Sequence, residues 1–92
     1  MMNKKRVFGI PIKYKGHIVL FRRIGNEIPK EMIDMILRLI DINFEEIEKT
    51  FQSTYGIGSI EVDISEDGKN FIVHSFYNFF FEGDINENEN KY

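Results

Sequence analysis

A stripe of large apolar residues in the middle of the chain constrains the fold more than any other sequence feature. Its members recur three or four positions apart, which is the spacing of one face of an α-helix. They are Ile33, Ile36, Ile40, Phe44, Ile47 and Phe51. The stripe predicts a helical segment from Pro29 to about Thr54, followed by Gly56 at a usual helix end. The Asp-Ile-Asn sequence at 41–43 is its weakest part. Both one irregular helix and two helices in series fit the pattern.

Residues 5–24, before this helix, are predicted to form a β-hairpin. Apolar residues alternate with polar or small ones on both sides of Lys15-Gly16, which supplies the turn. A two-residue loop there places Tyr14 opposite His17, and it makes one face of the hairpin apolar over most of its length. Pro11 cannot donate a backbone hydrogen bond, so the first strand should lie at a sheet edge or carry a bulge.

The second face of this hairpin is less polar than a solvated face should be. It carries Val7, Ile18, Leu20 and Ile24 beside Lys13 and Arg22. Such a face is either covered by another part of the chain or serves as an interaction surface. The sequence is compatible with both.

A second hairpin is predicted after the helical segment. Residues 60–65 alternate strictly between apolar and polar side chains, and Glu66-Asp67-Gly68-Lys69 is a strong turn signal. The return strand is expected to run from Asn70 to Phe81, with His74 directly across from Glu61. The chain therefore reads as β-β-α(α)-β-β. This order predicts an α+β fold in which an antiparallel sheet packs against one long or broken helix.

Residues 1–82 are expected to form a single α+β domain, since 92 residues support only one modest core. Residues 83–92 contain one aliphatic residue and an acidic excess, which predicts a disordered acidic tail.

Composition excludes several kinds of chemistry. The chain has no Cys, so it has no disulfide, thiolate nucleophile or Cys-ligated zinc. His17 and His74 have no partner at a metal-ligand spacing, and there is no Gly-rich phosphate loop. We therefore expect no catalytic residue, metal or cofactor, and a protein that is not an enzyme.

The N-terminal stretch does not read as a signal peptide, and Ile18–Phe21, the longest apolar run, is too short to span a membrane. The chain lacks Ala but has 15 Ile, a bias of AT-rich genes that points to a bacterial, phage or plasmid genome. The expected location is the cytoplasm of a bacterial host, with no membrane partner.

Charge is divided along the chain. Residues 1–26 hold 7 of the 12 Lys and Arg residues and none of the 15 acids, so they carry +7 and the rest carries −10, for a net charge of −3. The basic residues are Lys4, Lys5, Arg6, Lys13, Lys15, Arg22 and Arg23. Interleaved with aromatic residues, they are the candidate nucleic-acid surface. Those aromatics, however, share the predicted core face, and the overall charge is acidic.

A protein interface is the stronger candidate. The aromatic residues of the last predicted strand exceed what one helical layer easily covers, and aromatic anchors are typical of interface centres. They are Phe76, Tyr77, Phe79, Phe80 and Phe81. The acidic residues Glu45, Glu46 and Glu48 suit a helix N-terminus and also offer an acidic docking side. Self-association through the aromatic strand or the helical face predicts a homodimer.

The leading hypothesis is therefore a non-enzymatic protein-binding module from a phage or mobile element. It would dock onto a host macromolecule and inhibit or modulate it, with nucleic-acid charge mimicry as one possible mode. The alternative is a nucleic-acid-binding protein that uses the basic N-terminal hairpin.

Overall fold

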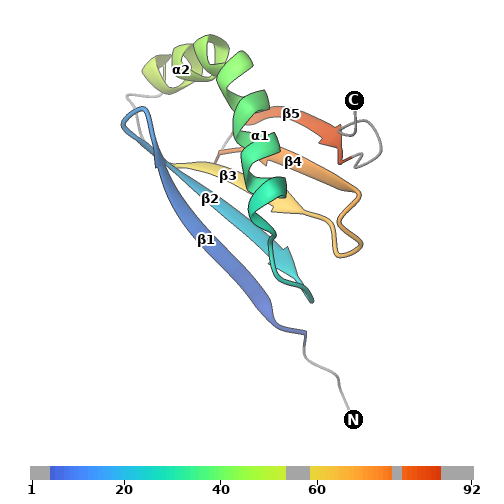
Figure 1. The fold of residues 1–92 in the computed structure, drawn as a ribbon. Helices are drawn as coiled ribbons and strands as arrows, with labels where there is room; N and C mark the ends of the chain where they lie inside the picture. Colours follow the sequence, from blue (N-terminus) through green and yellow to red (C-terminus); the bar gives the residue numbers. More distant parts are fainter. Residues whose placement is uncertain (1–4, 54–58, 76–77, 86–92) are drawn as a thin grey trace.

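A computed structural model describes residues 5–53, 59–75 and 78–85, which form a five-stranded mixed sheet with two helices on one face (Figure 1). The elements are β1 (Val7–Tyr14), β2 (His17–Ile24), α1 (Lys30–Ile42), α2 (Phe44–Ser53), β3 (Ile60–Ile64), β4 (Asn70–His74) and β5 (Phe79–Asp84). The strands lie in the order β1-β2-β3-β4-β5 across the sheet. The predicted α+β class is confirmed, and the chain order is β-β-α-α-β-β-β.

The first hairpin has the predicted register, with Tyr14 opposite His17. Lys15 and Gly16 both have positive φ, as a two-residue turn that follows the strand twist requires. β1 is an edge strand, as Pro11 indicated. The Gly25 N–H donates to the Arg6 carbonyl, and alternation along β1 then turns the backbone of Pro11 away from β2. The missing donor therefore faces the open edge.

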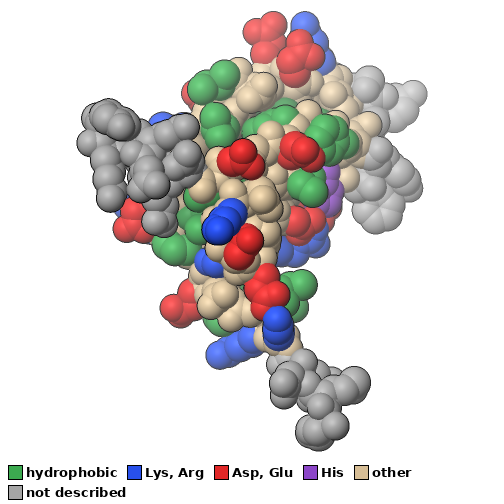
Figure 2. All heavy atoms as spheres, turned by 90° about the vertical axis from the view of Figure 1, so that its right-hand side faces the viewer, with side chains coloured by type: hydrophobic (Ala, Val, Ile, Leu, Met, Phe, Trp, Pro, Cys, Tyr) green, Lys and Arg blue, Asp and Glu red, His purple; other side chains and the backbone are tan. Residues whose placement is uncertain are grey.

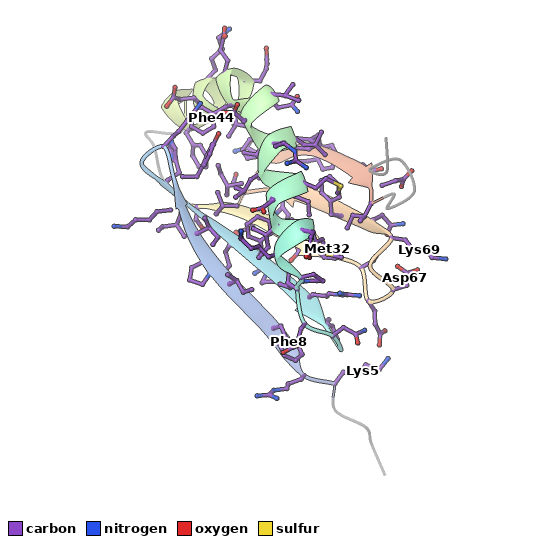
Figure 3. The ribbon with its side chains drawn as sticks, in the orientation of Figure 1. Lys5, Phe8, Met32, Phe44, Asp67 and Lys69 are labelled. Carbon is purple, nitrogen blue, oxygen red and sulfur yellow. The ribbon has the colours of Figure 1, made fainter. Side chains whose placement is uncertain are left out.

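The helical segment consists of two helices that meet at Asn43. The Asn43 side-chain amide donates to the Leu39 carbonyl at 2.8 Å, and its backbone N–H donates to the same oxygen at 3.2 Å. These bonds close the last turn of α1 and let the chain start α2 in a new direction. All six residues of the predicted apolar stripe are buried. In Figure 3, Met32 of α1 and Phe44 of α2 project toward the sheet.

The sheet is mixed, so the prediction of a purely antiparallel sheet was too simple. β2 and β3 pair in parallel, with Val19 opposite Ile60 and Arg23 opposite Ile64. The reason is the connection between them. The chain leaves β2, crosses one face of the sheet through both helices and returns beside β2 in the same direction, as parallel neighbours require.

The predicted single strand from Asn70 to Phe81 was wrong. β4 ends at His74, the Ser75 N–H donates to the Asn78 carbonyl at 2.7 Å, and β5 returns antiparallel to β4. β5 extends to Asp84, two residues past the domain boundary predicted at residue 82. Residues 76–77 and 86–92 lie outside the described residues.

The molecule is a slab with principal extents of 44 × 41 × 19 Å, and its short axis matches one sheet layer and one helical layer. Both helices lie over the same side of the sheet (Figure 1). Within the described parts of the chain, neither helix is long and apolar enough to cross a membrane.

Candidate functional site on the uncovered sheet face

The sheet face that points away from the helices, called the open face below, carries the candidate site. Strand register arranges its side chains in rows that run across the sheet. One row contains Gly9, Arg22, Asp63, Ile72 and Glu82. The next row contains Pro11, Leu20, Glu61, His74 and Phe79. Residues far apart in the sequence thus become neighbours on one surface.

Large exposed hydrophobic side chains concentrate on the open face. Among the described residues there are six, and five lie on this face: Val7 (63% exposed), Ile18 (39%), Ile24 (50%), Ile72 (43%) and Phe79 (62%). The sixth is Ile42 at the end of α1. No helix or strand of the described chain covers these five residues. Of the two alternatives for the first hairpin's outer face, cover by a helix or strand is not found among the described residues.

Four charged or titratable side chains form a bonded group at the centre of the open face. Arg22 binds Glu61 through Nη2 at 2.7 Å, and it binds Asp63 through Nε at 2.8 Å. His74 Nε2 lies 2.6 Å from the second carboxylate oxygen of Asp63. His74 thus faces Glu61 in the register, as predicted, but bonds to Asp63. These side chains satisfy one another's hydrogen-bonding groups, and their bonds connect β2, β3 and β4 on this face.

The bonds around Asp63 shift its ionisation. Partial burial of the carboxyl group opposes the charged form, but hydrogen bonds from Arg22 and His74 outweigh it and hold the pKa of Asp63 below its usual 3.8. Asp63 is therefore a carboxylate at neutral pH.

A hollow of about 460 Å³ lies at the β3–β4–β5 end of this surface. It is lined by Asp63, Ser65, Asn70, Phe71, Ile72, Glu82, Gly83 and Asp84. The ion pairs formed between described residues include Asp63 but neither Glu82 nor Asp84. Figure 2, which views the right-hand side of Figure 1, shows acidic, basic and hydrophobic side chains interspersed on that side of the molecule.

The predicted basic residues do not gather into one patch. Lys5 pairs with Glu66, Lys15 pairs with Asp41, and Arg22 belongs to the central group. Arg23 donates to the carbonyls of Glu27 and Glu66, and the Arg6 guanidinium lies over the Phe8 ring. Lys13 is exposed on β1, and Lys4 lies outside the described residues. Phe21, one of the interleaved aromatics, is fully buried.

The predicted interface residues are partly brought together. Phe79, Phe80, Phe81 and Glu46 line a second hollow of about 250 Å³ between α2 and β5. Phe80 and Phe81 also pack on the core, with Phe80 5.9 Å from the Phe51 ring. Phe76 and Tyr77 lie outside the described residues.

The acidic residues of α2 lie apart from the open face. Glu45 and Glu46 are exposed, with Glu45 3.8 Å from Lys49, and Glu48 lies 3.8 Å from His17.

Sequence reasoning missed Glu61, Asp63, Ile72 and Glu82 as site residues. The alternation in residues 60–64 already placed Glu61 and Asp63 on an outer face. The parallel β2–β3 pairing, which brings Arg22 to them, has no local sequence signal.

Metal binding has no geometric support in the described part of the chain, where no three His, Asp or Glu side chains are arranged to hold an ion. The two histidines are used separately. His17 stacks on Phe51 with ring centroids 5.0 Å apart, and His74 lies on the open face.

No protein-family model matches this chain, and neither curated proteins nor solved structures provide a significant match. Function must therefore be inferred from the surface of the molecule itself.

Proposed function

We propose that this chain is a non-enzymatic protein-binding module and that the open face is its docking surface. The observation that carries the proposal is the gathering of five large exposed hydrophobic residues on one face of a two-layer domain. Exposed apolar residues scattered singly are normal, whereas a shared face of them is typical of an interaction site.

The pattern of polar groups on the open face supports the same function. The central charges bond to one another, so a partner can cover them without leaving a buried charge unpaired. Exposed apolar residues lie on both sides of them, Ile24 on β2 and Ile72 on β4. A protein interface needs such apolar contacts together with satisfied polar groups.

The alternative, nucleic-acid binding by the basic hairpin, receives less support. Lys5, Lys15, Arg22 and Arg23 already bond to carboxylates or backbone carbonyls of the same chain. Releasing them for phosphates would break these bonds. The composition favours a phage or mobile-element origin, so we propose a bacterial host macromolecule as the partner that is inhibited or modulated. Exposed Glu45 and Glu46 remain candidates for charge mimicry.

A paired substitution tests the docking surface. Ile72→Lys places a charge on the open face, and Ile42→Lys makes the same change on the helical side at a residue that is 76% exposed. Proteins captured from bacterial cells by the wild-type chain are identified, purified and titrated calorimetrically with each variant. We expect Ile72→Lys to weaken binding at least tenfold, because a partner would have to desolvate the ammonium group. Ile42→Lys should bind as the wild type does.

Equal binding by both variants would reject the open face as the docking surface. If only Ile42→Lys loses binding, the docking surface lies on the helical side of the domain. Replacement of Glu45 and Glu46 by Lys tests charge mimicry. If the chain binds by charge mimicry, this double variant should no longer bind the captured partner.

A further inference from the structure

We propose that the open face binds a protein segment in which a short stretch of large apolar residues adjoins a lysine or arginine. In this arrangement, apolar side chains of the partner cover the β2 side, and one cationic side chain enters the hollow beside Glu82 and Asp84. This inference rests on the proposed protein-binding function and specifies the chemistry of the partner.

The net charge of the open face selects a cationic partner. Its Lys and Arg residues are Lys13 and Arg22, and its acids are Glu61, Asp63, Glu82 and Asp84, which together give −2. A second copy of the chain would present the same −2 and be repelled. Charge complementarity across an interface favours a positive partner and speeds its association.

The distribution of these groups determines which part of the bound segment should be apolar and which part cationic. The apolar residues Ile18, Leu20 and Ile24 lie on the open face of β2, with Arg22 between the last two, while all four acids lie on β3 and β5. A segment that crosses the strands therefore meets an apolar stretch first and a negative stretch second. Arg22 already pairs with both acids of β3, and His74 also bonds to Asp63. The acids of β5 make no ion pair within the described chain and are left for the partner.

The hollow at β3–β5 fits a long side chain with a charged end. Its lining combines the apolar side chain of Ile72 with the carboxylates of Asp63, Glu82 and Asp84. Lysine and arginine bury an apolar stem while they keep the cationic group among acceptors. A carboxylate accepts two parallel hydrogen bonds from a guanidinium, so arginine gains the most from this site.

Defined peptides test the inference without a known partner. One acetylated hexapeptide has three leucines followed by three arginines, and its counterpart has three leucines followed by three glutamates. Each is titrated into ¹⁵N-labelled protein, and amide shifts are followed by NMR. We expect the arginine peptide to shift the amides of Ile72, Glu82 and Asp84 in a saturable way. The glutamate peptide should leave them in place. Raising the salt concentration should weaken the binding.

A matched pair of double variants separates the site from general attraction to an acidic protein. Glu82→Gln with Asp84→Asn removes two carboxylates from the hollow, and Glu27→Gln with Glu31→Gln removes two exposed carboxylates near the start of α1. Both changes alter the net charge equally. We expect the first pair to weaken the arginine peptide about five- to tenfold, as two partly exposed ion pairs would, and the second pair to have little effect. Single Glu82→Gln serves if the double variant does not fold.

The inference is overturned if both double variants have equal effects, if the two peptides bind alike, or if neither peptide binds at millimolar concentration. These outcomes leave the proposed function intact, since that function is judged by Ile72→Lys against Ile42→Lys. If a captured partner no longer binds Ile72→Lys but still binds the variant without the Glu82 and Asp84 carboxylates, the open face remains the docking surface. The proposal of a cationic segment is then wrong.

Discussion

Phe71 lies directly across from Gly83 in the β4–β5 pair, and its ring occupies the space that a side chain at position 83 would need. A β-carbon built on Gly83 would come within 2.9 and 3.0 Å of two atoms of the ring. Phe71 is 2% exposed, so the ring has no free space into which to move. The fifth strand can therefore join the sheet only because residue 83 has no side chain.

Gly83→Ala should destabilise the fold by about 1–3 kcal/mol, the usual range for forcing extra atoms into a packed core. Urea unfolding measures the change. Gly9→Ala is the matched control, because it also adds a β-carbon to an edge strand, but its nearest neighbour lies 3.8 Å away. That control should stay within about 0.5 kcal/mol of the wild type. Equal losses in the two variants would show that Phe71 does not restrict position 83.

Phe79 and Phe80 are adjacent in β5 but should respond differently to replacement by serine. Phe79 is 62% exposed, whereas Phe80 packs on the core and against Phe51. We expect Phe80→Ser to cost about 1–3 kcal/mol and Phe79→Ser less than about 0.5 kcal/mol in urea unfolding. Similar costs for the two variants would contradict this placement of the rings.

The same Phe79→Ser variant tests the homodimer predicted from the aromatic strand. If β5 joins two copies, the variant should lower the mass measured by light scattering while the fold stays intact. A parent protein that is already monomeric would rule out that dimer.

The parts of the fold that the sequence predicted depend on local patterns. Two-residue alternation on both sides of Lys15-Gly16 determines the register of the first hairpin, and the apolar stripe determines which face of the helices is buried. The second hairpin as far as His74 follows from the turn at 66–69. In each case the interacting residues are neighbours in the chain or lie across a short turn.

The parts that the sequence did not predict depend on contacts between distant residues. Arg22 and Asp63 are 41 positions apart and meet only because β2 and β3 pair in parallel. The end of β4 was hidden by the aromatic residues that follow Ser75 in the sequence, because they continue a strand-like composition as far as Phe81. The candidate site combines these two features, so its central residues could not be assembled from the sequence.

Pro11 is expected to protect the free edge of the sheet. Its position on β1 faces outward and offers no donor to another strand. Pro11→Thr restores an N–H group there and should increase concentration-dependent self-association, measured by light scattering at several protein concentrations. Gly9→Ala changes the same strand without adding a donor and should leave self-association unchanged. An unchanged mass for Pro11→Thr would mean that another feature protects this edge.

Asp63 should contribute stability that depends on pH. Asp63→Asn removes the negative charge and one of the two oxygens that accept from Arg22 and His74, and we expect a loss of about 1 kcal/mol at pH 7, since the carboxylate is partly exposed. The native pKa of Asp63 is lowered from 3.8 because the bonds from Arg22 and His74 outweigh the cost of its burial. The stabilisation is therefore fully present above about pH 3.8. It disappears as the pH falls through the lower native value.

Urea unfolding of the wild type and Asp63→Asn from pH 7 to pH 2 measures this difference. The two stabilities should begin to converge only below pH 3.8 and should meet below the lowered native pKa of Asp63, where the carboxyl group is protonated in both states of the wild type. Glu45→Gln, which removes an exposed partner of Lys49 on α2, should change stability by a few tenths of a kcal/mol at most. Convergence well above pH 3.8 would contradict the lowered pKa. If Asp63→Asn lowers the unfolding free energy at pH 7 no more than Glu45→Gln does, the central group connects the strands without stabilising the fold.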